Sequence, residues 1–518
     1  MGGLDRGTLL ALGAMALAVF VIANDLTALS VALPNIESDF DSDVSTVQWV
    51  INAYALVFGV LIVTGGRLAD MFGRRRLFFV GAAIFATFSL LAGAAQGELW
   101  LILCRALMGI GGAIIWPAVL GMTYDVLPDD KAGLAGGLIL GVAGFGNAAG
   151  PLLGGFLTDA LSWRWIMFVN LPIAALAAFA TWRAIPPSPP AEHQRIDYAG
   201  IASISIGLVA LLVALDQVTQ WGWSDPRILF LFALCAVLLT AFAVVERRAG
   251  ATALIPRDVM ANPHFRAACI TTLFMSAVFF AALLFLPQFF QKILSYSPLE
   301  AGAALLPMMA VFAVTSFVAG SLYERLGAKL IVSAGTLCLT LGAFLVSLID
   351  RDSGFVSLVP GMLVMGVGVG LFYSSITTAA VTALDPSRAS LAGGIVYMFQ
   401  IAGGSVGLGL TTTVFITASE DRLQSDLSGS GLSGEEVDTL HGALAGTESA
   451  GEILARFSER TAERLIELVR DAFAAGMQWS FRLVAALALC GLVVSVLFVG
   501  GSLLRRGEEP APSPGTTA

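Results

Sequence analysis

Long apolar runs recur along almost the whole of this chain of 518 residues. Each run is about 20 residues long, which is the length that an α-helix needs to cross a hydrocarbon core of roughly 30 Å. Only 13% of the residues are charged, whereas an ordinary soluble domain carries about 25%. A water-soluble fold could not bury so much apolar surface. The sequence therefore predicts that lipid surrounds most of the chain.

The apolar runs are continuous and do not alternate between apolar and polar residues. In lipid every backbone polar group must be paired within the protein, so a spanning segment is a helix or part of a closed barrel. Continuous runs favour helices. We therefore predict an all-α polytopic membrane protein with fourteen transmembrane helices, at residues 8–30, 46–66, 78–96, 99–123, 133–158, 164–185, 197–218, 227–246, 267–291, 300–323, 329–349, 355–381, 389–417 and 479–503.

Lysine and arginine are unevenly distributed among the predicted loops. A cytoplasmic N-terminus would place most of the loop cations inside, where the loops of membrane proteins carry an excess of positive charge. The short outer loops would then hold only Arg164, Arg227, Lys292 and Arg351. We expect a multi-pass protein of the inner (cytoplasmic) membrane with both termini in the cytoplasm.

The two halves of the chain resemble each other at an offset of about 253 to 257 residues. GRLADMFG from Gly66 matches GSLYERLG from Gly320, and AGLAGGL from Ala132 matches ASLAGGI from Ala389. Repeated bundles around a central site allow alternating access in many secondary transporters. We predict two pseudo-symmetric six-helix bundles, the first at residues 1–190 and the second at residues 261–518. A linker and two inserted helices, at residues 191–260, separate them.

Two polar segments interrupt the apolar pattern. The Pro-rich stretch AIPPSPPAEHQR, residues 184–195, is expected to be a short cytoplasmic linker. Residues 419–478 are polar, but their later part carries apolar residues at helical spacing. We expect an extracellular amphipathic insertion that lies on the membrane or caps the protein; a disordered acidic loop is the alternative.

The segment GGRLADMFGRRR, residues 65–76, follows the second predicted helix. Glycine permits a tight turn and a close approach of helices, and an aspartate beside arginines can form charge-assisted bonds across a gate. A loop that served only to orient the protein would need the arginines, but neither the aspartate nor the glycine spacing. The segment resembles the cytoplasmic signature of the major facilitator superfamily, which it matches at Gly66, Asp70, Gly73 and Arg74.

Arg105 stands inside the apolar run LILCRALMGIGGA of the fourth predicted helix. A buried arginine costs several kcal/mol unless it is paired or hydrated, so it is a candidate functional residue. The run resembles the second signature of the same superfamily. The helix ends at Asp125, and the resemblance implies that this carboxylate pairs with Arg74; a simple surface position is the alternative.

The fifth predicted helix contains GNAAGPLLGG. Its glycines and proline give a deformable face without large side chains, on which another helix can move. The segment resembles the proline–glycine signature of antiporters in this superfamily, which it matches at Gly146, Gly150, Pro151, Gly154 and Gly155.

Three further segments, NDLTALSVALPNI, VQWVINAYAL and WRWIMFVNLPI, begin at residues 24, 47 and 163. They are similar to segments of the fourteen-helix drug:proton antiporter family, and the resemblance covers essentially the whole chain. It implies a proton-coupled efflux antiporter of cationic or lipophilic drugs and antibiotics, in which Asp25 is the membrane carboxylate.

The chemistry of Asp25 and Arg105 supports proton coupling independently of the resemblance. Lipid surroundings favour the neutral form of a carboxylate and a nearby cation favours its charged form, so a conformational change can exchange a proton for substrate. Counted along their helices, the two residues lie at compatible depths, roughly 13 Å and 9 Å inward of the outer ends. A purely structural hydrogen-bonding role for Asp25 is the alternative.

The nature of the cargo is only partly constrained. Spans nine to thirteen hold no acidic residue in their interiors, whereas relatives that accept dications often carry further carboxylates there. We therefore expect a lipophilic substrate that is neutral or carries one positive charge. Aromatic and amide side chains that could line its cavity are Trp49, Tyr54, Trp116, Gln288, Tyr373 and Gln400.

Other classes of function find little support in the sequence. No phosphate-binding loop is present, the three histidines lack metal-ligand spacing, and no basic patch suggests nucleic acid. We expect a monomer without cofactor or metal that is not an enzyme, and whose partners are a small molecule, protons and the bilayer. Export of an endogenous lipid, siderophore or self-made antibiotic, and a non-transporting sensor on this scaffold, remain alternatives.

Overall fold

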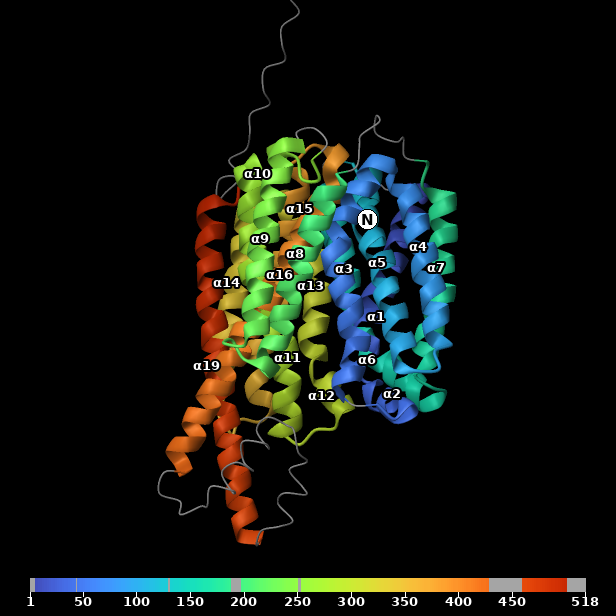
Figure 1. The fold of residues 1–518 in the computed structure, drawn as a ribbon. Coiled ribbons are helices and arrows are strands. Elements are labelled where there is room, and N and C mark those ends of the chain that lie inside the picture. The colour runs from blue at the N-terminus through green and yellow to red at the C-terminus, as the bar shows by residue number, and fades with distance from the viewer. Residues whose placement is uncertain are drawn as a thin grey trace, which may run out of the picture.

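The computed structural model describes residues 5–42, 44–128, 131–187, 197–249, 253–427 and 459–500. Within these ranges the chain forms helices joined by short turns, without a strand. Fourteen of the helices are long and apolar enough to cross a membrane. Figure 1 shows them packed side by side in one upright bundle. The fold class predicted from the sequence is therefore confirmed.

The long helices are α1 (Arg6–Ala28), α3 (Val44–Phe72), α4 (Arg74–Gly93), α5 (Glu98–Val126), α6 (Ala132–Ala160), α7 (Arg164–Ala184), α8 (Tyr198–Trp221), α9 (Pro226–Ala249), α11 (Pro263–Lys292), α13 (Leu306–Leu326), α14 (Ala328–Val346), α15 (Phe355–Thr382), α16 (Ala389–Leu427) and α19 (Glu459–Phe498). Short elements at the ends of the bundle are α2 (Leu33–Phe40), α10 (Arg257–Ala261), α12 (Pro298–Ala304) and the 3-10 turn η3 (Pro386–Arg388).

The long helices form two groups that follow the sequence repeat. Helices α1 and α3 to α7 make the first half, and α11, α13 to α16 and α19 make the second. The halves meet along two seams, which we call the first seam (α3 with α16) and the second seam (α6 with α13). The inserted helices α8 and α9 pair with each other, and α8 also packs against α3 and α16 beside the first seam.

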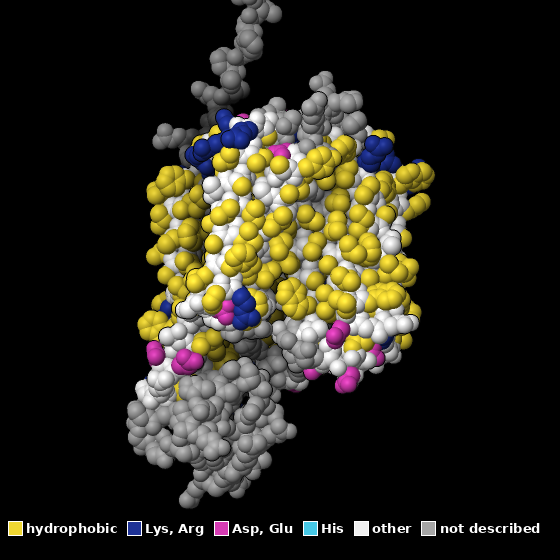
Figure 2. Space-filling model, in the orientation of Figure 1, with side chains coloured by type: hydrophobic (Ala, Val, Ile, Leu, Met, Phe, Trp, Pro, Cys, Tyr) yellow, Lys and Arg dark blue, Asp and Glu magenta, His cyan; other side chains and the backbone are white. Residues whose placement is uncertain are grey.

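The charged side chains separate the two ends of the bundle. Figure 2 shows a broad hydrophobic band, with lysine and arginine gathered at one end and most of the aspartate and glutamate at the other. We call these the basic end, which contains the turn between α3 and α4, and the acidic end, which contains α2. The first helix starts at the basic end, and α19 finishes there, where the carbonyl of Phe498 meets His264 at the start of α11.

Helices α16 and α19 are longer than a membrane crossing requires. They contain 39 and 40 residues, so each is roughly 60 Å long, about twice the thickness of a hydrocarbon core. In Figure 1 both project beyond the other helices at the acidic end. Within the bundle the two helices touch through the rings of Phe415 and Phe473, whose centroids are 5.0 Å apart, and Phe415 also meets Phe285 of α11.

This arrangement corrects the prediction for residues 419–478. Residues 419–427 continue α16 and residues 459–478 begin α19, so the described parts are extensions of spanning helices and not a separate helix lying on the membrane. Extending a helix costs much less than nucleating a new one. The rest of the predicted insertion, residues 428–458, lies outside the described residues, as do residues 188–196 of the predicted linker.

Candidate functional site

A fully buried ion pair lies in the first half of the bundle. Nη1 of Arg105 on α5 is 2.5 Å from Oδ2 of Asp25 on α1, and both side chains have 0% exposure. Arg105 also donates from Nε to the carbonyl of Val50 at 2.9 Å. Its guanidinium lies 4.4 Å from the ring centroid of Tyr54 on α3. A buried charge is strongly destabilising without its partner, so each member of the pair requires the other.

Asn170 completes the surroundings of Asp25. Its Nδ2 donates to Oδ1 of Asp25 at 2.8 Å and to Oγ of Ser89 on α4 at 3.2 Å. Oγ of Ser89 donates in turn to the carbonyl of Met167 at 2.8 Å. The carboxylate is therefore held by side chains from α5 and α7. Neither Asn170 nor Ser89 was predicted from the sequence, although Asn170 lies in the WRWIMFVNLPI segment.

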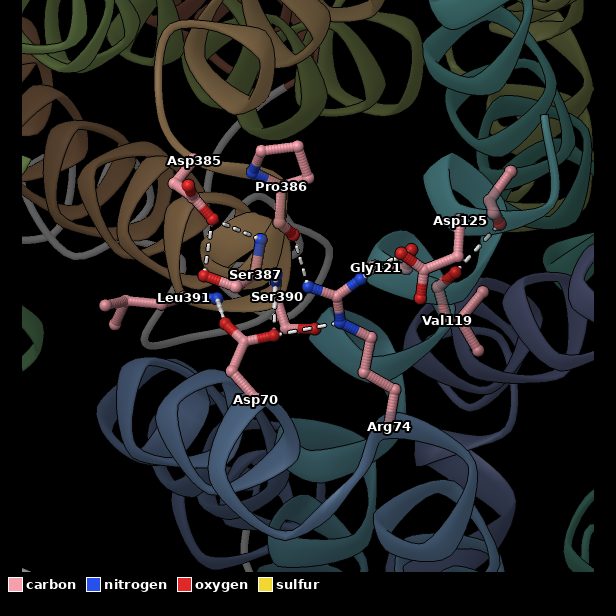
Figure 3. Close-up of polar contacts among 11 residues, drawn as sticks. Asp70, Arg74, Val119, Gly121, Asp125, Asp385, Pro386, Ser387, Ser390 and Leu391 are labelled. Carbon is pink, nitrogen blue, oxygen red and sulfur yellow. Dashed lines mark hydrogen bonds and ion pairs between the residues drawn. The ribbon is translucent and has the colours of Figure 1, made fainter. Parts of the chain in front are cut away.

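A second polar cluster lies at the basic end (Figure 3). Nε of Arg74, at the start of α4, is 2.9 Å from Oδ1 of Asp70 near the end of α3, and Nη1 pairs with Oδ1 of Asp125 on α5. Nη2 donates to the carbonyl of Pro386 at 2.6 Å. The first three residues belong to the first half and Pro386 belongs to the second. Arg74 therefore connects the two halves.

Asp70 also connects the two halves. Its Oδ2 accepts a hydrogen bond from the backbone N–H of Leu391 at 2.8 Å, and Oδ1 accepts one from Ser390 at 3.4 Å. These N–H groups belong to the first turn of α16, where an α-helix leaves its donors without partners and presents a partial positive charge. An aspartate of the first half thus caps a helix of the second half.

The glycines of the segment GGRLADMFGRRR, residues 65–76, do not lie where we predicted. We expected a loop with a tight turn after the second helix, but Gly65, Gly66 and Asp70 are all part of α3, and only Gly73 breaks the helix, with φ of 95°. A Cβ at Gly66 would lie 2.5 Å from the carbonyl oxygen of Ser390. Gly66 is therefore needed for the close approach of α3 and α16.

The second seam has the same construction. A Cβ at Gly133 on α6 would lie 2.4 Å from the carbonyl oxygen of Gly320 on α13, and a Cβ at Gly320 would lie 2.6 Å from that of Gly133. In the sequence repeat Gly320 corresponds to Gly66 and Gly133 corresponds to Ser390. Both seams are thus closely packed at equivalent positions near the basic end.

The sequence model of the Major Facilitator Superfamily matches residues 15–408. The chain belongs to this superfamily. The puromycin resistance protein pur8 of Streptomyces alboniger is 35% identical over 77% of this chain and 80% of that protein. The tetracenomycin C resistance and export protein of Streptomyces glaucescens is 28% identical over 98% of this chain and 94% of that protein. Among solved structures, that of the human organic anion transporter MFSD10 (TETRAN) is similar to this one, with a TM-score of 0.62 and 12% sequence identity. The match covers 95% of this chain and 100% of that protein's chain.

The family membership predicted from the motifs is thereby confirmed, and the chain is a multi-pass membrane transporter of the facilitator type. In this facilitator, α6 uses its glycines to pack against the helix that carries Asp25. A Cβ at Gly150 would lie 2.0 Å from Oγ1 of Thr27, and one at Gly154 would lie 2.1 Å from the carbonyl oxygen of Ala28. Gly146 meets the same helix one turn earlier.

Two other residues of that signature face the second half of the facilitator. A Cβ at Gly302 on α12 would lie 3.7 Å from Cβ of Pro151, and one at Gly155 would lie 3.6 Å from Cδ1 of Leu299. The signature segment therefore contacts α1 within its own half and α12 of the other half.

The six cavity candidates occupy different environments in the facilitator. Trp116 on α5 lies between the halves, with its ring 4.9 Å from that of Tyr397 on α16, and Tyr397 also meets Phe58 at 5.4 Å. Tyr54 packs on Arg105, as described above. Tyr373 is buried in the second half, with its hydroxyl 3.0 Å from Oγ of Ser276. The partly exposed candidates are Trp49, Gln288 and Gln400.

Proposed function

We propose that this facilitator exports lipophilic molecules that are neutral or carry one positive charge across the cell membrane in exchange for protons. The observation that carries the proposal is the buried ion pair of Asp25 and Arg105. It encloses a titratable carboxyl in the first half of the transporter. The names of the two relatives describe resistance to puromycin and resistance to and export of tetracenomycin C. Those names support export of drugs and antibiotics.

The pair provides a means of coupling. A proton that binds Oδ2 of Asp25 competes with Nη1 of Arg105 for the same oxygen, so the protonated carboxyl and the ion pair are alternative states. A ligand shifts a conformational equilibrium only by its differential affinity for the two states. We assign proton binding and substrate binding to opposite conformations, so that each cycle releases a proton inward and substrate outward.

We assign the basic end to the cytoplasm, which places both termini inside and the projecting parts of α16 and α19 outside. Support comes from the concentration of lysine and arginine at that end (Figure 2). The close packing of both seams at the basic end would then make the structure a conformation closed to the cytoplasm. We also propose that the protein acts as a monomer, and that it is a transporter and not an enzyme or a sensor.

Cysteine labelling tests the orientation. In a background without the five native cysteines, Asp352→Cys lies in the exposed turn before α15 at the acidic end, and Thr382→Cys lies at the exposed basic end of α15. We expect an impermeant maleimide to label the first variant on intact cells and the second only after permeabilisation. The reverse pattern would show that the assigned orientation is inverted.

Asp70→Asn tests the gate at the first seam. The change removes a negative charge from the first turn of α16, and this contact between the halves exists only while they are closed at this end. The pair of Asp70 with Arg74 lies within the first half. If the closed conformation loses about 1.4 kcal/mol of stabilisation, the ratio of closed to open molecules falls tenfold. Spin labels at Phe72 and Leu326, exposed by 40% and 37% at the basic ends of α3 and α13, should report longer distances in the variant.

The matched control for the gate is Asp385→Asn. Asp385 lies beside the same cluster but accepts hydrogen bonds only within its own turn, from the hydroxyl and the N–H of Ser387. These bonds lower the pKa of Asp385, so its substitution also removes one negative charge. Distances in this control should match the wild type. If Asp70→Asn matches the wild type as well, Asp70 does not bias the gate.

The proposed function is tested in everted membrane vesicles from expressing cells, whose interior is acidified by respiration. Addition of ethidium, a lipophilic monocation, should raise the internal pH as protons leave in exchange for it, and a dication of similar size should act less strongly. Vesicles from cells without the protein give the baseline. A response that survives collapse of the pH gradient by nigericin, or the absence of any response across a panel of lipophilic compounds, would contradict proton-coupled export.

A further inference from the structure

We infer that the inserted helices carry a second part of the gate at the basic end, in which Glu246 of α9 attracts Arg67 of α3 while the two halves are closed. This inference rests on the gate proposed above and gives the insert a role in it. Both side chains are buried, with 8% exposure for Glu246 and 7% for Arg67. Arg67 lies three residues before Asp70 on the same helix, so it belongs to the first seam.

The carboxylate of Glu246 is held in place by backbone groups. Its Oε1 accepts a hydrogen bond from the N–H of Leu254 at 2.9 Å, and its Oε2 accepts one from the N–H of Ile255 at 3.1 Å. A Cβ at Gly200, in the first turn of α8, would lie 2.9 Å from the same Oε1. Burial disfavours the charged form of a carboxylate, whereas these donors and a nearby arginine favour it. Glu246 therefore has a defined position at the basic end of the insert.

The segment that follows α9 is joined to the second half. Asp258 on α10 pairs with Arg388 of η3, just before α16. Nδ2 of Asn262 donates to the carbonyl of Ala383, at the end of α15, at 2.8 Å. Glu246 bonds to the backbone of this same segment, so it is tied to the second half at the basic end.

Arg67 supplies the opposite charge from the first half. Within that half it attracts Asp70, and across the seam it attracts Glu246 and Asp258. Arg388 repels it, but that charge is itself paired with Asp258. Helix α8 packs against both α3 and α9 (Figure 1), which places the insert beside the seam. Because water and salt screen buried charges less than exposed ones, separation of the halves at this end would weaken a substantial attraction.

A double-mutant cycle tests the inference. Glu246→Gln and Arg67→Gln each remove one charge, and spin labels at Phe72 and Leu326 give the ratio of closed to open molecules in purified full-length protein in lipid nanodiscs. We expect Glu246→Gln to lower this ratio about threefold or more. In the Arg67→Gln background the same change should have a clearly smaller effect, because the charge that Glu246 attracts is already gone.

The matched control is Asp225→Asn, in the turn before the other end of α9. Hydrogen bonds from Arg227 lower the pKa of Asp225, so this change also removes one negative charge from the insert, and the ratio should match the wild type. If Glu246→Gln does not fold, Asp258→Asn takes its place in the cycle. Asp258 is 66% exposed, and its loss removes an attraction for Arg67 and leaves Arg388 unpaired, so it should also favour open molecules.

The outcomes separate this inference from the proposed function. If Glu246→Gln leaves the ratio unchanged, or lowers it equally with and without Arg67, Glu246 does not act on the gate through Arg67, although the gate stands where Asp70→Asn still opens it. If neither Asp70→Asn nor Glu246→Gln changes the ratio, the gate does not lie at the first seam and the inference fails with it. Proton-coupled export is measured separately in vesicles, so it can stand or fail independently of both results.

Discussion

Asp25→Asn is expected to reduce proton-driven export to the level of cells that lack the protein, a loss of at least about 100-fold, or about 2.7 kcal/mol in activation free energy. Asparagine keeps the shape of the side chain but cannot bind and release a proton. Its amide must also point its donors at either Arg105 or Asn170, both of which already donate to this position. Coupling is therefore lost even where folding is retained.

The matched control for this variant is Asp39→Asn. Asp39 is also a carboxylate paired with an arginine, since its Oδ2 is 2.7 Å from Nη1 of Arg164, but this pair is 40% and 31% exposed at the acidic end. Exposed pairs contribute little, so the control should export at nearly the wild-type rate. Export is measured as ethidium efflux from loaded cells, normalised to protein in the membrane. Substantial gradient-driven export by Asp25→Asn would remove this residue from the mechanism.

Arg105→Ala is expected to abolish export and also to destabilise the protein. The change leaves the carboxylate of Asp25 buried without a counter-charge, which costs about 3–5 kcal/mol when one partner of a buried pair is removed. It also removes the Nε donor from Val50 and the cation from the ring of Tyr54. Arg105→Lys keeps one charge but lacks the planar fork, so we expect less than about a tenth of wild-type export.

A double variant separates the two effects of Arg105→Ala. Asp25→Asn/Arg105→Ala has no unpaired charge at the site, so its thermal unfolding temperature in detergent should exceed that of Arg105→Ala alone. Export should stay at background, because no titratable carboxyl remains. A double variant whose destabilisation equals the sum of the two single losses would show that the residues do not interact energetically.

The sequence was sufficient to predict the fold because lipid imposes length and hydropathy on each span. The first span was placed at 8–30 and the helix is Arg6–Ala28. Larger differences arise where charged residues continue a helix beyond the apolar run. Thus α3 extends to Phe72 and α19 begins at Glu459, because a helix does not end where its surroundings change from lipid to water.

The candidate site was only partly predictable. Asp25 and Arg105 stood out as charges within apolar helices, but counting residues gives the depth of a side chain and not the direction in which its helix turns it. Asn170 and Ser89 are neutral, and such residues are ordinary in membrane helices. The bond from Asp70 to Leu391 joins residues 321 positions apart, so it depends on how the two halves pack, which no local pattern shows.

Transport by purified protein in liposomes tests the central claim most directly. With the membrane potential clamped by potassium and valinomycin and the interior made acidic, the protein should take up ethidium against its concentration gradient, and internal protons should leave in step with it. Asp25→Asn should do neither, and the wild type without a pH gradient should only equilibrate ethidium. Equal uptake with and without the gradient, or uptake without proton movement, would contradict proton-coupled export.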